Sequence, residues 1–459
     1  EDNSKKNIIT DSLTLNSHQY KSYGVKSGIG EKENLFVEIG YNHIVNDSVV
    51  NNSIQKVNAS NNFSVNSQII NNSNSKLSIF GNYRILKRNS NERKEKFLNS
   101  RIDYFKKTSN DVIKINVLYE SNSGNLAQQE YTFIEVEPGI GNYKWIDINE
   151  NNIQELEEFE IAQFEDEGIY LRVLLPNQKF IKTYQNKFSQ SLNINFKSWS
   201  KDESKFKKLL SHFQNQTQYL IQKQSAQGNN KFDLNPFKIS SNSLLGLTMN
   251  LRNSLFFNRG KEYYSTTYNF TNNRSKNSLS FGNIQNDILS HQLTFKHKLN
   301  SILFSSLISI DNKKSKSDNF ESKNYTFEEI KYTPKFTYFI ENNNKIDFYY
   351  QYSNKENLIG NFETLTQNKF GVSSSFSNKN KLAINGELNY YKNKFKGNPN
   401  SIIGYIMMEG LQSGDNLTWT LNIQKKVTKY VDLNLNYFAR KSDYNSVIHN
   451  GSVQLKANF

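Results

Sequence analysis

Alternation of apolar and polar residues with a period of two runs through the second half of the chain and constrains the fold more than any other feature. Successive side chains of a β-strand point to opposite faces, so each run has one apolar and one polar face. Residues 417–427 show the pattern, with apolar positions at Leu417, Trp419, Leu421 and Ile423. Because the second face stays polar in run after run, it must meet water and not a packed core. This pattern is typical of a transmembrane β-barrel wall.

The alternation predicts an all-β chain of about fourteen or more antiparallel strands, each about ten to sixteen residues long, which is enough to cross a bilayer when tilted. After residue 205 the predicted strands lie near 206–224, 243–257, 262–272, 276–285, 288–299, 301–311, 327–341, 345–353, 361–376, 380–391, 401–412, 417–427, 431–439 and the C-terminus. Pro334 falls inside one of them and indicates a bulge or a break in the ladder. No segment approaches the ~18–20 apolar residues of a transmembrane helix, so a membrane location requires a closed sheet.

The sequence suggests three regions. Residues 1–136 are β-rich and form either early barrel strands or a separate β domain. Residues 137–200 contain an acidic insertion and connecting strands, and residues 201–459 form the C-terminal transmembrane barrel. Within the first region, 1–32 and 46–75 are rich in Asn and Ser and are predicted to be loops or frayed edges.

Composition agrees with a barrel. The chain has 459 residues, no cysteine, 36% hydrophobic residues and 13% aromatic residues. Disordered chains are poor in aromatic residues, whereas barrels place them at the membrane interfaces. The net charge of +14 could favour nucleic acid, but no compact basic helix or zinc module supports that, so we expect no nucleic-acid partner. The simpler interpretation is that these charges lie in a solvated lumen and in loops, where a basic lumen would favour anionic solutes or acidic lipid headgroups.

The last residues resemble the signal by which outer-membrane barrels are recognised. Gly451, Val453, Leu455, Ala457 and the terminal Phe459 share one face of an amphipathic strand that ends in an aromatic residue. The resemblance implies that the barrel-insertion machinery reads this strand and that the C-terminus is periplasmic. The alternative is an ordinary edge strand that ends in Phe.

An acidic loop at 147–158 is spaced like a calcium-binding EF-hand loop. Side-chain oxygens come from Asp147, Asn149 and Asn151, a main-chain carbonyl from Ile153, and a bidentate carboxylate from Glu158. The sixth position, normally Gly, is Asn, which also tolerates a left-handed backbone. The sequence therefore predicts a Ca²⁺ site that stiffens the loop. The alternative is an acidic turn that caps a helix-like stretch at 153–164.

A catalytic site is not predicted. His43, His212, His291, His297 and His449 lie in alternating strands, and His18 lies in the polar N-terminal stretch. No nucleophile motif, phosphate-binding loop or HExxH motif accompanies them. We therefore expect the protein not to be an enzyme.

Two segments resemble large outer-membrane proteins of the Bacteroidota. One is Gly141-Asn142-Tyr143-Lys144-Trp145-Ile146-Asp147 with Glu158-Phe159. The other is Gly404-Tyr405-Ile406-Met407-Met408-Glu409-Gly410-Leu411, with Trp419 and the region from Arg440 to Phe459. The resemblance covers about residues 137–459. It implies that this chain, which starts at Glu1 without a signal region, is the C-terminal barrel part of a longer envelope protein. Relatives of this kind tend to have Gly where this chain has Asn152.

The expected location is the bacterial outer membrane, with outer-membrane lipids around the barrel. The expected function is that of a non-catalytic barrel that acts with protein partners in an envelope complex for protein or lipoprotein export, barrel biogenesis or envelope organisation. The alternative is an outer-membrane channel or transporter for polar or anionic solutes, which the basic polar face favours.

Overall fold

The protein is described here from a computed structural model. The described residues are 2–3, 13–14, 17–31, 34–51, 53–89, 91–108, 110–127, 130–175, 180–227, 232–239, 243–261, 263–279, 282–341, 344–378, 381–428, 430–443 and 446–457. They form two compact units. The first comprises 1–128, 178–198 and 216–251, and the second comprises 129–177, 199–215 and 252–459. Each unit is described by itself.

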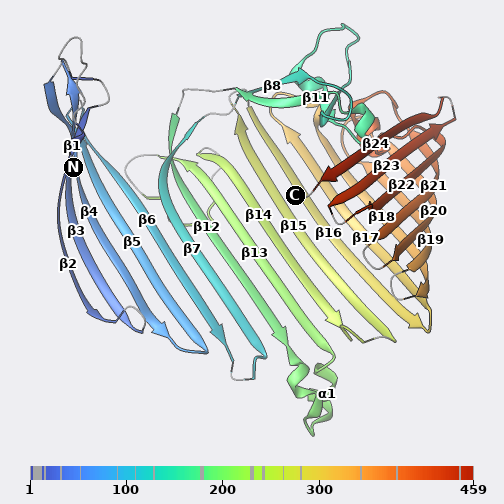
Figure 1. Cartoon of the computed structure of the whole chain (residues 1–459), viewed down its shortest axis with the longest axis horizontal. Coiled ribbons are helices and arrows are strands. Elements are labelled where there is room, and N and C mark those ends of the chain that lie inside the picture. The colour runs from blue at the N-terminus through green and yellow to red at the C-terminus, as the bar shows by residue number, and fades with distance from the viewer. Residues whose placement is uncertain are drawn as a thin grey trace. The chain divides into compact units, whose positions relative to one another are not determined.

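The first unit is an antiparallel meander in which each strand pairs with the next (Figure 1). Its strands are β1 (Asp2–Asn3), β2 (His18–Gly30), β3 (Phe36–Val50), β4 (Ser53–Asn71), β5 (Ser75–Arg88), β6 (Asn91–Lys107), β7 (Ile113–Ala127) and β12 (Phe180–Asn195). The last ladder joins β7 to β12 from Ile113↔Ile194 to Ala127↔Phe180. β13 (Phe213–Ala226) and β14 (Leu244–Phe257) have residues in both units.

The second unit contains another antiparallel meander, in which consecutive strands again pair. Its strands are β15 (Tyr264–Leu279), β16 (Gly282–Leu299), β17 (Ile302–Ser317), β18 (Tyr325–Glu341), β19 (Asn344–Asn357), β20 (Thr364–Asn378), β21 (Leu382–Lys396), β22 (Gly414–Lys426), β23 (Val431–Ser442) and β24 (Ile448–Ala457). The prediction of an all-β chain of long antiparallel strands is confirmed.

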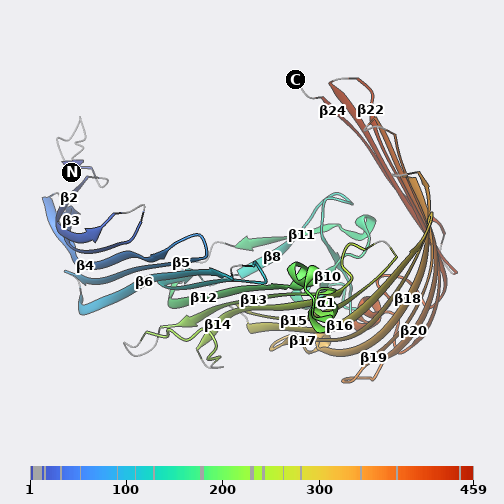
Figure 2. The ribbon, with the colours of Figure 1, turned by 90° about the horizontal axis from the view of Figure 1, so that it is seen from below.

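The two faces of this second meander differ in chemistry. One face exposes large apolar side chains, and we call it the apolar face; Phe336, Phe348 and Phe370 on it are 54%, 52% and 54% exposed. The other, which we call the polar face, carries residues such as Glu329 and Asp347 on the same strands. Figure 2 shows that this meander is curved. Alternation in the sequence therefore corresponds to two physically different surfaces.

The first unit repeats this division, with exposed Val25, Ile39 and Phe63 sharing one face. Near one end of β12 and β13, residues 232–239 fold over that face, and we call this segment the clasp. The side chain of Lys223 lies beneath the clasp and is 1% exposed. Its Nζ donates to Asp233 Oδ2 at 2.7 Å and to the carbonyl oxygens of Asn235 and Lys238 at 2.6 and 3.0 Å.

Four local predictions are wrong. The predicted strands 262–272 and 276–285 are not separate strands, because β15 continues to Leu279 and β16 begins at Gly282. Residues 401–412, predicted as a strand, contain the helix α2 (Ile402–Met407), because the Ser401 side chain caps its N-terminus and its apolar residues are consecutive, not alternating. The predicted strand 206–224 begins with another helix, α1 (Lys205–Leu210). The Asn- and Ser-rich stretches 1–32 and 46–75 contain all of β2 and β4, because short polar side chains suit the polar face of a strand.

At Pro334 the ladder breaks but does not bulge. The register between β18 and β19 is the same on both sides of the break, at Tyr332↔Tyr352 and at Lys335↔Tyr349. The two residue pairs between these positions are missing from the ladder. Proline has no N–H to donate, which explains the gap. In the described part of the chain, no helix has the length and apolar character needed to cross a membrane.

Candidate functional site

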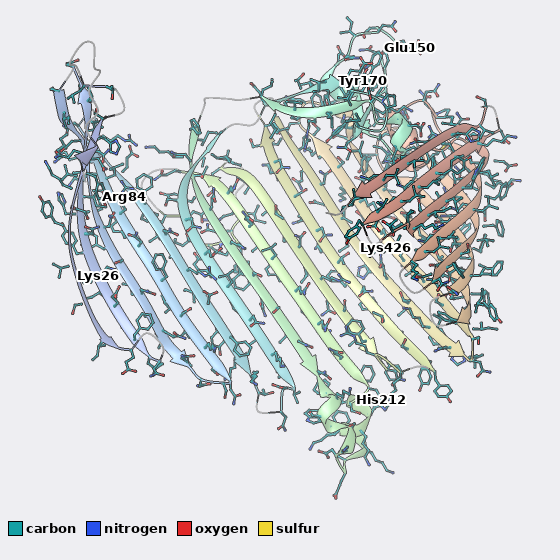
Figure 3. All side chains as sticks on the ribbon, in the orientation of Figure 1. Lys26, Arg84, Glu150, Tyr170, His212 and Lys426 are labelled. Atoms are coloured by element: carbon teal, nitrogen blue, oxygen red, sulfur yellow. The ribbon has the colours of Figure 1, made fainter. Side chains whose placement is uncertain are left out.

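Residues 130–175 of the second unit form a separate four-stranded sheet, which we call the inserted sheet. It comprises β8 (Glu130–Glu135), β9 (Tyr143–Trp145), β10 (Phe159–Ile161) and β11 (Tyr170–Leu175), with the 3₁₀ turns η1 (Leu156–Glu158) and η2 (Glu165–Glu167). Figure 2 shows this sheet on the concave side of the curved meander of the same unit. In Figure 3, Glu150 and Tyr170 mark the inserted sheet at one end of that meander, and His212 lies at the other end.

An aromatic cluster holds the inserted sheet together. Phe133 and Phe159 stack with ring centroids 4.1 Å apart, and Tyr170 meets Phe159 edge-on at 5.0 Å. Burial raises the pKa of Tyr170. Gly141 and Gly168 let two backbone segments approach, since a Cβ on either would overlap the other segment. Such a cluster gives a small sheet its own core.

Arg440 on β23 joins the inserted sheet to the polar face. Its Nη2 donates to Asp166 Oδ2 at 2.7 Å and Glu167 Oε1 at 3.1 Å. Its guanidinium also lies over the Phe164 ring, 4.1 Å from the centroid. Lys144 donates to the same Glu167 oxygen at 3.0 Å. The contact is thus made by paired charges and an aromatic ring, a combination suited to a half-buried interface.

Tyr405 on α2 makes a second connection. Its hydroxyl donates to Glu167 Oε2 at 2.6 Å and accepts the N–H of Gln163 at 2.9 Å. Burial raises the pKa of Tyr405, and the hydrogen bond to Glu167 raises it further, so the hydroxyl stays protonated at neutral pH. The helix itself is anchored on the polar face, where Met407 and Met408 pack in a buried cluster with Leu365.

Lysines are frequent elsewhere on the polar face of β17–β20, where they surround buried carboxylates. Glu329, 2% exposed, lies 3.2 Å from Lys331 and 3.4 Å from Lys313. Asp347 lies 3.1 Å from Lys335 and, at 3.6 Å, from a second lysine, Lys345. Two further lysines contact other carboxylates: Lys355 lies 3.7 Å from Glu409, and Lys369 lies 3.9 Å from Glu387. Six lysines therefore share this wall with fewer carboxylates.

A cavity of about 760 Å³ lies between the inserted sheet, the α2 loop and the end of β23. Arg440, Lys144, Glu167 and Tyr405 all line it. Because its walls come from segments far apart in the sequence, and because charged and aromatic groups converge there, we take this cavity as the candidate functional site.

The predicted calcium loop lies at the edge of this cavity, with Asp147 in its lining. Asp147 accepts the N–H groups of Asn151 and Asn152 at 3.2 and 2.9 Å, and Asn152 has a φ of +60°. The side-chain oxygens of Asn149 and Asn151 accept N–H groups of the loop itself. The turn therefore has the left-handed residue that the spacing predicted.

Glu158 is brought back against this loop, fully buried. Its Oε2 accepts Trp145 Nε1–H at 2.7 Å and its Oε1 accepts the N–H of Ile148 at 3.0 Å. The loop is thus closed by N–H donors around Asp147 and Glu158, while Ile153 is exposed. The alternative prediction of a helix-like stretch at 153–164 is wrong, because this stretch holds only η1 and the short strand β10. No cluster of three or more His, Asp or Glu side chains arranged for a metal occurs among the described residues.

Calcium binding stays a prediction, and we expect it to be weak, with a Kd of about 10⁻⁴–10⁻³ M, because a cation must compete with these N–H donors for the same oxygens. The Trp145 indole is hydrogen-bonded to Glu158, so its fluorescence should change when Ca²⁺ binds Glu158. A Ca²⁺ titration followed by tryptophan fluorescence therefore measures binding directly. D147N should remove the response, whereas E203Q, in a distant exposed turn, should leave it unchanged. A flat titration up to about 10 mM Ca²⁺ would exclude the site.

The C-terminal strand has the predicted alternation. β24 carries Gly451, Val453, Leu455 and Ala457 on one face, and Val453 and Leu455 are 69% and 68% exposed. Phe459 lies outside the described residues. The role of this strand as an insertion signal stays a prediction.

The histidines face amides and phenols. His291 Nδ1 lies 2.8 Å from the Tyr268 hydroxyl, and His449 Nδ1 lies 2.8 Å from the Tyr437 hydroxyl. His212 bonds the side-chain oxygen of Asn258 at 2.6 Å. Neutral partners of this kind fix the orientation of each imidazole ring.

Comparison with known proteins returns no matching family model and no curated relative. Among solved structures, the chain is similar to the ferric-catecholate import receptor Fiu of Escherichia coli K12 in its closed form, with 9% identity, a TM-score of 0.36, and 95% of this chain and 74% of that one covered. It is similar to OccK11 of Pseudomonas aeruginosa at 8% identity and a TM-score of 0.34, covering 96% and 95% of the two chains. It is also similar to an anion-selective porin of Comamonas acidovorans at 11% identity and a TM-score of 0.29, covering 82% and 90%.

Sequence reasoning missed Arg440 and Tyr405 as site residues. Tyr405 lay in a segment predicted as a strand, 401–412, and Arg440 lay just beyond the predicted strand 431–439, so neither side chain was assigned to a site. One signal was present: the run from Ile402 to Met408 is apolar on consecutive positions, which a strand with one polar face does not tolerate.

Proposed function

We propose that the chain forms the wall of a β-barrel in the bacterial outer membrane, with its apolar face against lipid. What supports this is the apolar face itself, where side chains such as Ile310, Phe336 and Phe348 are more than half exposed on adjacent strands. Burying each such side chain is worth about 1.5–3 kcal/mol. An apolar surface that continues from strand to strand is unusual for a protein in water and normal for one in lipid.

We further propose that the inserted sheet lies on the extracellular side. Barrels have short periplasmic turns and longer extracellular loops. In the second unit, the end away from the inserted sheet has the connections 258–263, 300–301, 342–343, 379–381 and 427–430. The end near it has 318–324, 358–363, 397–413 and 443–447, and a single short connection at 280–281. β24 runs away from the inserted sheet, which agrees with a periplasmic C-terminus.

The function that this geometry supports best is passage of polar and anionic solutes, with the inserted sheet as a plug and no catalytic role. The observation that carries the proposal is that Arg440 and Tyr405 hold the inserted sheet to the polar face, the face on which the lysines of β17–β20 gather. A wall with excess positive charge concentrates anions. A folded segment bound to that wall obstructs the path.

Planar-bilayer recording of the purified full chain tests this proposal. Replacing residues 130–175 with a short Gly-Ser linker should raise single-channel conductance several-fold, because it removes the obstruction. K331E combined with K335E should shift ion selectivity from anions toward cations. R274Q, which alters an exposed arginine of β15, is the matched control and should change neither property. Equal conductance with and without the inserted sheet would contradict the plug.

A second candidate is a non-catalytic component of an envelope assembly. It is favoured by apolar side chains exposed on the inserted sheet: Ile140, Ile153 and Ile161 are 57%, 62% and 60% exposed. Outside lipid, such residues commonly mark protein contacts. Purification from native membranes in mild detergent should then yield a stoichiometric partner that is lost with I140S combined with I161S.

A further inference from the structure

The basic groups in the lining of the cavity are already paired with carboxylates. Lys144 and Arg440, the basic residues of its lining, are both engaged by Glu167, and Arg440 also by Asp166. Among the described residues, the acidic Glu150 at its edge has no cationic partner. A phosphate or sulfate would therefore meet cations that are already paired and an unpaired carboxylate, so the cavity does not suit an anion.

The remaining lining combines two chemistries. One part is aromatic or apolar and the other is neutral and hydrogen-bonding, represented by Trp145, Tyr405, Leu411, Asn400, Gln412 and Ser442. A purely apolar ligand would leave the side-chain amides of Asn400 and Gln412 without partners, which costs free energy. A ligand that matches must present an apolar face beside an edge rich in hydroxyl groups.

We propose that this cavity binds a neutral oligosaccharide. A pyranose ring has C–H faces that pack on aromatic side chains and equatorial hydroxyls that pair with amides and carboxylates. The volume of about 760 Å³ lies within the usual range for small-ligand sites. The proposal rests on the proposed function in one respect: the cavity must be reachable from the extracellular side.

Isothermal titration calorimetry on the full chain, in a detergent without a sugar headgroup such as lauryldimethylamine oxide, tests the inference. The probes are maltotetraose, N-acetylchitotetraose, a sulfated tetrasaccharide and a lysine-rich peptide. We expect at least one neutral tetrasaccharide to bind with a Kd of about 0.1–1 mM. S413W, which places an indole in the cavity, should weaken binding at least about tenfold.

Matched variants separate loss of the site from loss of folding. N400A, in the cavity lining, should weaken binding several-fold, whereas N361A, on an exposed loop at the same end of the strands, should not. S301W, at the opposite end, is the control for S413W. Binding that S413W leaves unchanged, binding of only the sulfated probe or the peptide, or no heat with any probe would overturn the inference. Conductance is a separate measurement, so failure of the plug proposal and failure of sugar binding are distinguishable.

Discussion

Replacing Gly371 with alanine should destabilise the second unit, because its wall has no room for the added methyl group. Gly371 pairs with Tyr349 across β20 and β19, and the Tyr349 ring lies over it. A Cβ at position 371 would overlap that ring. The ring would have to move away, and its hydroxyl would lose its hydrogen bonds to Glu387 at 2.6 Å and to Asn389 at 2.5 Å. Overpacking costs about 1–3 kcal/mol, and leaving the oxygen of the buried Asn389 without this donor adds about 1–3 kcal/mol.

The measurement is urea unfolding in detergent, followed by the heat-modifiable mobility of the folded barrel in gels. Gly386 on β21 is the matched control, because a Cβ there would meet the nearest side-chain atom at 3.4 Å, an ordinary contact. G386A should therefore unfold at nearly the wild-type urea concentration. The double variant G371A with Y349A should regain part of the loss by removing the ring. Equal midpoints for G371A and G386A would show that the ring moves aside freely.

Replacing Lys223 with methionine should release the clasp and cost about 1–3 kcal/mol of stability in the first unit. Lys223 uses all three of its donors on the clasp, on Asp233 and on two carbonyl oxygens. Methionine can fill the space but leaves the carboxylate and both carbonyls without the ammonium group. Ser225 donates to the same carboxylate at 3.2 Å, and a hydroxyl cannot neutralise it.

Limited trypsin proteolysis measures release of the clasp, because Lys238 lies within the clasp and becomes cleavable once the clasp detaches. K182M on the neighbouring strand β12 is the control, since Lys182 is 51% exposed and pairs with Glu95 at the surface. It should be cleaved at Lys238 as slowly as the wild type, because exposed ion pairs contribute little. If K223M and K182M were cleaved at the same rate, the clasp would be held by its apolar contacts alone.

The strands were predictable because each needs only local information. The residues that alternate in 417–427 and 431–439 form β22 and β23, with Leu421 opposite Tyr437 on the apolar face. The period of two is a property of backbone geometry and is visible in one sequence. Stretches rich in Asn and Ser were wrongly predicted as loops, because these residues are common in turns. In β4 the same residue types occupy the polar face of a strand.

The site was less predictable because it depends on contacts distant in the sequence. The turn around Asp147 and Asn152 could be inferred, since its geometry is set by a few consecutive residues. The partner of Glu167 could not, because Arg440 lies 273 positions away. Nothing in the local sequence of β23 distinguishes an arginine that binds a neighbouring sheet from one that faces water.

The place of the inserted sheet in the chain has a consequence for the order of assembly. β7 and β12 pair along their length, yet residues 128–179 separate them, whereas most other neighbouring strands are joined by a few residues. Bringing two strands together across a longer flexible segment loses more chain entropy. Pairing of β8 with β11, which joins Glu130 to Leu175, brings the two ends of that segment close before β7 meets β12. A nascent chain that folds this segment first can therefore pair β7 with β12 as readily as it pairs two strands joined by a short turn.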